Sequence, residues 1–387
     1  MNETQETIQR VLENVLGIPF TDGNRVDVLR NGDEIFPAML EAIGAAQSRI
    51  ELLTFIYWKG DIAQRFALAL AERARAGVHV RVVLDAVGAA EMAESLLRTM
   101  REAGVDVQWF RPVTRWTLWQ MDNRTHRKVL VVDGLVGFTG GVGIAAEWEG
   151  DARNEREWRD THFRIIGPAV QGLQGAFYSN WAETGRRLYE PPDRLPRPRR
   201  QAVGDARLQV VRTTASTGWS DIATIVELLI ELGRQRLRIA SAYFVPDEQT
   251  IANLNRAVAR GVEVDVMMPG AHTDQRVSQL AGEAEFMRLL DGGVRLWKYQ
   301  RSMLHTKIMT IDAAVACVGS ANFNQRSMRK DDELAVVVLD AEVVRKLDGH
   351  FEADLQHCEP IRPEQWRRRG PVQRLLEVVV RPVKSQS

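Results

Sequence analysis

Two short stretches of the sequence carry histidine, lysine and aspartate at one spacing, His-x-Lys-x4-Asp, followed by a Gly-Gly or Gly-Ser pair. The first is THRKVLVVDGLVGFTGG with His126, Lys128 and Asp133, and the second is LHTKIMTIDAAVACVGS with His305, Lys307 and Asp312. These residue types suit phosphate chemistry, because lysine supplies positive charge and histidine can act as nucleophile, acid or base near neutral pH. A spacing that occurs twice predicts one site built from two halves.

The histidine and lysine of each stretch are two residues apart in an alternating apolar segment, so a strand places both on one face. If the halves face each other about a pseudo-twofold axis, two imidazoles flank one phosphorus. One imidazole can attack the phosphorus while the other protonates the departing alkoxide. A single copy would be equally well explained by two solvated residues at a strand end. Two matched copies favour a catalytic site, and its chemistry needs no metal ion or other cofactor.

Residues that follow the motifs supply further groups for binding a phosphate. Ser320 and Asn322 offer hydrogen-bond donors, and Gly141 lets the backbone approach the phosphate closely. Asp133 and Asp312 complete the catalytic motif. Because each of them ends its strand, we favour a role in fixing the local turn over contact with substrate.

Two acids lie at the start of apolar strands downstream of the motifs, Asp160 in EWRDTHFRI and Glu333 in KDDELAVVVL. A carboxylate that is hydrogen-bonded to an imidazole fixes its tautomer and stabilises the imidazolium. We therefore expect Asp160 and Glu333 to support the two histidines. The alternative is that both are ordinary surface acids.

The elements that must position these residues also occur twice. Helical spacing alternates with apolar runs of strand length before each motif, which predicts an α/β fold with two similar α/β/α lobes related by a pseudo-twofold axis. In the first half, helices are predicted at 36–47, 61–77 and 89–104, and strands at 49–58, 78–85 and 105–110. In the second half, helices are predicted at 219–233, 248–261 and 277–293, and strands at 237–246, 262–269 and 294–299.

The boundaries of the expected units follow from composition. Residues 1–20 hold a short amphipathic helix, and 21–188 form the first lobe. A stretch rich in proline and arginine, 189–204, reads as an exposed linker, because proline stiffens the backbone and removes hydrogen-bond donors. Residues 205–387 form the second lobe, which ends in a basic tail.

Composition excludes several classes of protein. The 387 residues contain 51 Lys plus Arg and 51 Asp plus Glu, so the chain lacks the overall basic field of a nucleic-acid binder. Two cysteines cannot build a disulfide framework. The N-terminus does not resemble a signal peptide, and no apolar run reaches the roughly 18 to 20 residues of a spanning helix. We therefore expect a cytoplasmic protein that is soluble or peripheral to a membrane.

The duplicated motif resembles that of the phospholipase D superfamily, and the resemblance covers about residues 24–370. Within it the chain is most similar to bacterial cardiolipin synthases, on the motifs already quoted together with WRDTHFRIIGPAV, FYSNW, YFVPD and GSANFNQRS. The resemblance implies the phospholipase D fold and transfer of a phosphatidyl group to an alcohol through a phosphohistidine, with phosphatidylglycerol as the typical substrate and no metal. It further implies His126 as nucleophile and His305 as general acid and base, an order that the symmetric motif does not itself decide.

Two departures from the family pattern stand out. Many relatives have Gly-Gly-x-Asn after the first motif, where this chain has Gly143 in place of the asparagine. Relatives also commonly have spanning N-terminal segments, so this chain resembles a soluble branch that reaches lipid from the cytoplasmic face of the inner membrane. The segment WFRPVTRWTLWQ, with Trp116 and Trp119 among arginines, suits a lipid headgroup region, unless its tryptophans pack the lip of the site.

Two other functions remain as alternatives. The chain could be a phosphodiesterase of the same superfamily that hydrolyses phospholipid or nucleic acid. Neutral net charge and the two-lobe length argue against nucleic acid as substrate. A lipid-binding protein without catalysis is the other alternative, and two intact His-Lys pairs argue against it. The sequence leaves the oligomeric state open.

Overall fold

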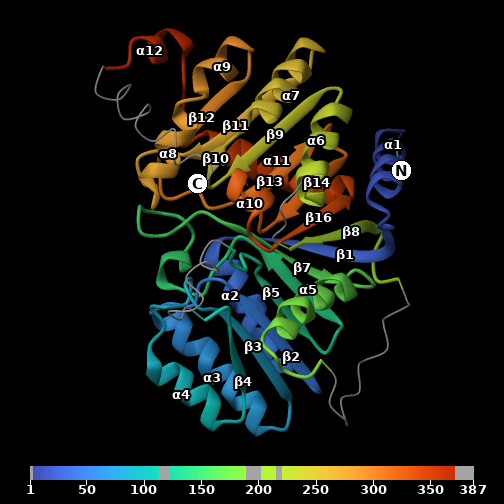
Figure 1. The fold of residues 1–387 in the computed structure, drawn as a ribbon, viewed down its shortest axis with the longest axis vertical. Coiled ribbons are helices and arrows are strands. Elements are labelled where there is room, and N and C mark those ends of the chain that lie inside the picture. Colours follow the sequence, from blue (N-terminus) through green and yellow to red (C-terminus); the bar gives the residue numbers. More distant parts are fainter. Residues whose placement is uncertain (1–2, 113–122, 189–201, 215–219, 371–387) are drawn as a thin grey trace.

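The protein folds into two lobes of similar architecture, one above the other in Figure 1. The computed structural model describes residues 3–112, 123–188, 202–214 and 220–370. The expected α/β fold with two alternating lobes is confirmed. Most of the expected linker, residues 189–201, and the end of the basic tail lie outside the described ranges, so the proposed unit boundaries stay predictions.

The first lobe alternates strands with helices. Its elements are β1 (Thr21–Arg30), α2 (Asn31–Ala45), β2 (Arg49–Thr54), α3 (Asp61–Arg75), β3 (His79–Asp85), α4 (Glu94–Glu102), β4 (Asp106–Phe110), β5 (Val129–Val132), β6 (Val136–Gly140), β7 (Thr161–Ile166) and α5 (Val170–Glu183).

The second lobe repeats this order with short additions. Its elements are β8 (Ala206–Thr213), α6 (Asp221–Leu232), β9 (Arg236–Ser241), β10 (Phe244–Val245), α7 (Glu248–Ala259), β11 (Glu263–Pro269), α8 (Arg276–Glu283), α9 (Phe286–Asp291), β12 (Arg295–Tyr299), β13 (Lys307–Ile311), β14 (Val315–Gly319), β15 (Phe323–Asn324), α10 (Gln325–Arg329), β16 (Glu333–Leu339), α11 (Ala341–Leu355), β17 (Cys358–Pro360) and α12 (Pro363–Arg367).

Most predicted elements are present, with four corrections. The strand expected at 49–58 ends at Thr54, and the strand expected at 237–246 is two strands, β9 and β10. The helix expected at 89–104 begins at Glu94, and the helix expected at 277–293 is two helices, α8 and α9. Strands β1 and β8, which the pattern did not predict, join the lobes. For β1 the prediction failed because the strand is rich in polar residues.

Within the described residues, 15 strands form one continuous sheet in the order β17-β12-β11-β9-β13-β14-β16-β8-β1-β7-β6-β5-β2-β3-β4. The order β12 to β8 in the second lobe mirrors the order β4 to β1 in the first, and β8 pairs antiparallel with β1 at the junction. Strands β2, β3 and β4 run parallel, as do β9, β11 and β12. The mirrored order gives the molecule its pseudo-twofold axis.

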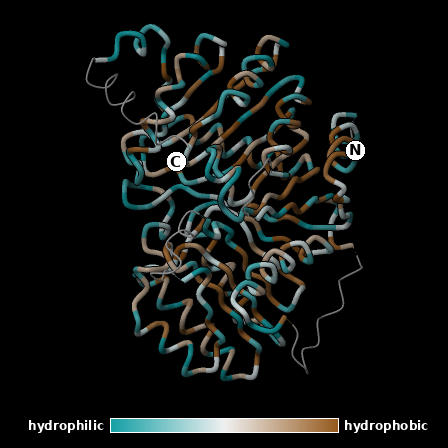
Figure 2. The backbone as a smooth tube through the Cα atoms, in the orientation of Figure 1, coloured by the Kyte–Doolittle hydropathy of each residue, from teal (hydrophilic) through white to brown (hydrophobic). Residues whose placement is uncertain are grey.

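One hydrophobic core crosses the junction between the lobes. It includes Val28 and Phe163 from the first lobe and Val336 and Leu347 from the second, and it lies under helices α5 and α11. Apolar stretches of the chain gather along the strands of both lobes in Figure 2. The lobes are therefore packed as one body.

Helix α1 (Glu3–Leu16) precedes the first lobe in sequence but packs on the second. Ile8 and Leu12 are fully buried against α6, and the Gln5 side chain donates to the Ala314 carbonyl at 2.9 Å. In Figure 1 this blue helix stands beside the yellow and red elements of the second lobe. The start of the chain thus binds the lobe that is more distant in sequence.

Candidate active site

The segments that carry the two histidines lie at the junction between the lobes, each hydrogen-bonded to the other lobe. The His126 backbone N–H donates to the Asp332 carbonyl at 2.9 Å, and the His305 N–H donates to the Arg159 carbonyl at 2.7 Å. The two contacts are equivalent under the pseudo-twofold axis, because Asp332 precedes Glu333 and Arg159 precedes Asp160. These bridges bring both motifs into one site.

Each histidine is bonded to an acid of the opposite lobe. His126 Nδ1 lies 2.9 Å from Glu333 Oε1, and His305 Nδ1 lies 2.8 Å from Asp160 Oδ2. The order along the chain would instead pair each histidine with the acid of its own lobe, since Asp160 follows the first motif and Glu333 follows the second. An ionised carboxylate only accepts hydrogen bonds, so the proton of each neutral imidazole sits on Nδ1 and the lone pair on Nε2.

The two acids are completely buried and fully engaged. Asp160 accepts from Trp148 Nε1 at 2.9 Å and from the Thr161 N–H at 2.8 Å, and Glu333 accepts from the Ser320 hydroxyl. Burial acts to raise the pKa of both carboxyls, but the hydrogen bonds and charges of the histidines and lysines outweigh it and hold the pKa of each below its usual value. Both acids are therefore ionised at pH 7.

The two lysines lie buried between the histidine-acid pairs. Lys128 Nζ donates to the His126 carbonyl at 2.8 Å, and Lys307 Nζ donates to the His305 carbonyl at 2.6 Å. Burial, followed by repulsion from Lys307, lowers the pKa of Lys128 to about 7. Burial likewise lowers the pKa of Lys307 to about 8. A bound anion would restore the charged forms, so this pair is poised to receive a phosphate.

The imidazoles are neutral at pH 7 in the free protein. Burial, followed by the charge of Lys128, lowers the pKa of His126 below its usual value. Burial, followed by the charge of Lys307, lowers the pKa of His305 to about 3. A neutral imidazole whose Nε2 carries the lone pair is the form that attacks an electrophile.

The two motif aspartates lie at the far ends of their strands and hold turns. Asp133, with a φ of 53°, accepts from the N–H groups of Gln47, Ser48 and Arg49 at 2.7–2.9 Å. Asp312, also with a φ of 53°, accepts from the N–H groups of residues 234–236. No hydrogen bond in the described ranges joins either carboxylate to a site histidine or lysine. The geometry supports the turn-fixing role and gives no support to their place among the catalytic residues.

The predicted phosphate-binding groups have three different surroundings. The Ser320 hydroxyl is occupied by Glu333, whereas the buried amide of Asn322 has an oxygen without a hydrogen-bond partner among the described residues. Gly141 faces Asp160, and an added Cβ would lie 2.3 Å from its Oδ1. Ser320 thus helps position Glu333, and Gly141 makes room for Asp160. Their proposed phosphate contacts remain predictions.

The departure at Gly143 has a steric cause. A Cβ at this position would lie 2.8 Å from Ile56 Cβ and 3.1 Å from the ring of Trp148. An asparagine would clash with both side chains. Ile56 and Trp148 therefore leave no room for a side chain at this position.

Aromatic side chains surround both histidines, and the sequence analysis did not identify them. Trp148, Trp158 and Tyr243 have ring centroids 5.2, 5.3 and 6.2 Å from that of His305, and Phe55 lies 5.3 Å from His126. Trp158 and Tyr243 begin the quoted segments WRDTHFRIIGPAV and YFVPD, but nothing in the pattern placed them beside His305. Their apolar faces account for much of the burial that lowers the pKa of the histidines.

A buried ion pair positions the segment before His126, and it too was missed. The Arg124 guanidinium binds the Asp85 carboxylate at 2.9–3.1 Å, and Asp85 also accepts from the Thr125 N–H. Asp85 ends β3, at the carboxyl edge of the parallel strands. This pair ties the first motif to the sheet.

Known proteins of similar sequence belong to the family that the two site motifs indicate. Residues 39–149 and 228–355 match the family described as "Cardiolipin synthase, PLD-like domain". The chain is 33% identical over 94% of its length to the cardiolipin synthase of Geobacillus thermodenitrificans, covering 72% of that protein. It is 32% identical over 92% of its length to cardiolipin synthase A of Pseudomonas fluorescens, covering 74% of it.

The chain belongs to this family. The expected family assignment is thereby confirmed. A solved structure of similar fold is the phosphatidylserine synthase of Haemophilus influenzae, with a TM-score of 0.72, 15% identity and full coverage of both chains. A polyphosphate kinase of Porphyromonas gingivalis follows with a TM-score of 0.57, 16% identity and coverage of 92% of this chain and 56% of its own.

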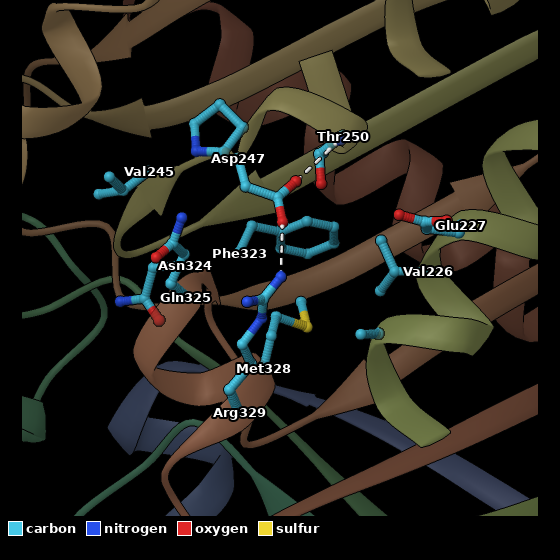
Figure 3. A pocket seen from close by; sticks show the side chains of 12 residues that line it. Val226, Glu227, Val245, Asp247, Thr250, Phe323, Asn324, Gln325, Met328 and Arg329 are labelled. Carbon is cyan, nitrogen blue, oxygen red and sulfur yellow. Dashed lines mark hydrogen bonds and ion pairs between the residues drawn. The ribbon is translucent and has the colours of Figure 1, made fainter. Parts of the chain in front are cut away.

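This cardiolipin synthase family member has a small hollow in the second lobe, lined by both apolar and polar side chains and of about 420 Å³ when its open mouth is counted. Figure 3 shows its walls, with Arg329 reaching toward Asp247. A second hollow, of about 280 Å³, shares Val226, Phe323 and Met328 with the first and touches Lys307. Apart from the open solvent that these volumes include, neither hollow has room for more than about one or two water molecules.

The aromatic and basic segment before the first motif is only partly described. Trp116 and Trp119 lie outside the described residues. Of the remainder, Phe110 is buried, Trp109 is half-buried, and Arg111 pairs with Glu183 at 2.8 Å. Among the helices that the structure describes, none combines the length and the apolar character needed to cross a bilayer.

Proposed function

We propose that this protein is a phosphatidyltransferase that forms cardiolipin or a related phospholipid by moving a phosphatidyl group to an alcohol. The observation that carries the proposal is the pair of histidines, each held by a buried carboxylate of the opposite lobe, with two buried lysines between them. The two imidazoles each offer a nitrogen lone pair, and the two lysines regain their positive charge when an anion binds beside them. Both properties suit reaction with a phosphodiester.

The first half of the reaction forms a phosphohistidine. His126 Nε2 attacks phosphorus, the bond from phosphorus to the leaving alcohol breaks, and Glu333 stabilises the positive charge that grows on the imidazole. The entering anionic phosphodiester raises the pKa of His305, which takes up a proton from solvent on Nε2 and passes it to the departing alkoxide. The choice of His126 as nucleophile rests on the family resemblance.

The second half reverses these steps with a new alcohol. His305 removes the proton from the acceptor hydroxyl, whose oxygen attacks phosphorus and breaks the bond to His126. In the proposed case one phosphatidylglycerol is the donor and another is the acceptor, so glycerol is released. We propose that the protein meets these lipids as a peripheral protein on the cytoplasmic face of the inner membrane.

A phosphatidyl donor with a good leaving group tests the role of His126 as nucleophile and the role of His305 as acid separately. With phosphatidyl 4-nitrophenol in mixed micelles, the leaving group needs no proton, so His305→Ala and Asp160→Asn release a burst of about one nitrophenolate per protein and keep a covalent adduct. His126→Ala releases none. Glu333→Gln slows the burst by about 10²- to 10⁴-fold, because the imidazolium loses its carboxylate.

The same preparations decide between the functions. With phosphatidylglycerol, wild-type protein is expected to produce cardiolipin and glycerol, measured by mass spectrometry. Cleavage of single-stranded DNA without lipid transfer would replace the proposal with a nuclease function. An adduct on His305 in place of His126 would exchange the two histidine roles.

A further inference from the structure

The walls of the site differ on its two sides. Strands β2 and β9 are equivalent, and each ends in a hydroxyl that donates to the carbonyl two residues on, from Thr54 to Ile56 and from Ser241 to Tyr243. Tyr243 therefore stands where the first lobe has the apolar Ile56. The His305 side has a phenol at this position, and the His126 side has only hydrocarbon.

Tyr243 links His305 to an acid at the rim of the site. Its ring meets the imidazole edge to face, with centroids 6.2 Å apart. Its hydroxyl donates to Asp274, lying 2.7 Å from Oδ2 and 2.9 Å from Oδ1. Tyr243 is half-buried and Asp274 is exposed, so the pair extends from the ring of His305 to solvent.

The loop that carries Asp274 is fixed in place. It follows β11, where the Gly270 N–H donates to the Tyr299 carbonyl at 2.8 Å, and Gln279 Nε2 donates to the Gly270 carbonyl at 2.9 Å. His272 Nδ1 of the same loop lies 3.7 Å from Glu155 Oε2 of the first lobe. Asp274 is therefore held at a defined place beside the site.

The proposed transfer reaction indicates which part of the substrate binds on the His305 side of the site. If His305 protonates the leaving alcohol and later deprotonates the acceptor, both alcohols sit next to His305 in turn. A glycerol headgroup brings further hydroxyls that need partners when it leaves water. A carboxylate with two acceptor oxygens and a phenol that both donates and accepts can bind such neighbouring hydroxyls.

We propose that Tyr243 and Asp274 form a polyol subsite that binds the free hydroxyls of the leaving and the accepting headgroup. The subsite rests on the proposed transfer and defines its acceptor class as an alcohol with at least one further hydroxyl near the reacting one. On the opposite side, Phe55 packs 5.3 Å from His126 and offers no such partner. The polar subsite thus favours glycerol-type acceptors over monohydric alcohols.

A competition between two acceptors tests the subsite. Phosphatidyl 4-nitrophenol is the donor, glycerol and 1-propanol are present together, and the ratio of phosphatidylglycerol to phosphatidylpropanol is measured by mass spectrometry. The ratio is expected to fall about tenfold to a hundredfold in Asp274→Asn and Tyr243→Phe, the range for one hydrogen bond that involves a charged group. Because both products form on the same active molecules, partial loss of folded protein leaves the ratio unaffected.

The control removes a similar bond elsewhere. Tyr178→Phe deletes a phenol that lies 3.1 Å from Glu51 Oε1, away from both histidines, and the product ratio is expected to stay at the wild-type value. An unchanged ratio in both subsite variants would overturn the polyol subsite while leaving the transfer intact. Absence of both products with the wild-type protein would instead overturn the proposed function.

Discussion

The free protein holds two site histidines neutral and two site lysines near the pH at which they lose their charge. Burial lowers the pKa of Lys128 to about 7 and that of Lys307 to about 8, far below the usual value of a lysine. A lysine with a lowered pKa is charged only below that value. Substrate capture by the free protein therefore depends on pH within the physiological range.

This dependence predicts the pH profile of kcat/KM, which reports ionisations of the free enzyme. As pH rises through 7 and 8 the lysines lose their protons, so kcat/KM is expected to fall, mainly through a higher KM. In Lys128→Arg one cation stays charged, and its repulsion lowers the pKa of Lys307 below about 8, so the remaining fall is expected to begin at a lower pH than that of Lys307 in the wild type. A flat profile from pH 6.5 to 9 would contradict the lowered lysine pKa values.

Ser320 offers a second prediction at the scale of single residues. Its hydroxyl donates to Glu333, so Ser320→Ala is expected to lower kcat about tenfold with little change in KM, because the acid behind His126 loses a partner. A hydroxyl that bound the substrate phosphate would instead give a higher KM when removed. Steady-state kinetics on the two proteins distinguish these roles.

At the scale of elements, helix α1 stabilises a lobe far from it in sequence. Leu12 is fully buried against α6, whereas Val15 on the same helix is 55% exposed. Leu12→Ala is expected to lower the free energy of unfolding by about 2–5 kcal/mol, and Val15→Ala by less than about 0.5 kcal/mol. Urea titration followed by circular dichroism measures both. Equal effects would mean that the α1 contact contributes little.

At the scale of the whole molecule, the lobes share a sheet and a core. Leu347 on α11 of the second lobe packs in the cluster that includes Phe163 of the first. We expect one calorimetric unfolding transition, and Leu347→Ala should move all of it to lower temperature while costing about 2–5 kcal/mol. Two separate transitions, with only one of them moved, would show that the lobes unfold independently.

Much of the fold was predictable from the sequence because each lobe repeats a strong alternation of apolar strands and amphipathic helices. Strands β1 and β8 were not; in β1, TDGNRVDVLR has few apolar residues, and of these Val28 alone is fully buried. Their strand conformation depends on pairing with each other and with β7 and β16. Such pairing is a tertiary effect that local pattern does not contain.

The residues of the site were predictable from the sequence, but which acid is hydrogen-bonded to which histidine was not. Matched spacing marks both histidines and both lysines, and the two acids were predicted because each begins an apolar strand downstream of its motif. That Asp160 binds His305 depends on how the lobes face each other across 145 positions of sequence. The steric reason for Gly143 likewise required the positions of Ile56 and Trp148.

The exchange of carboxylates between the lobes bears on how such a duplicated chain could arise. Each half carries a histidine for itself and an acid for its neighbour, so a lone half would hold an imidazole with no carboxylate behind it. Two identical copies, joined through the edge where β1 meets β8, would complete both pairs at once. A single-repeat ancestor with this chemistry would have had to work as a twofold dimer, and fusion of its genes would then free the two halves to specialise for donor and acceptor.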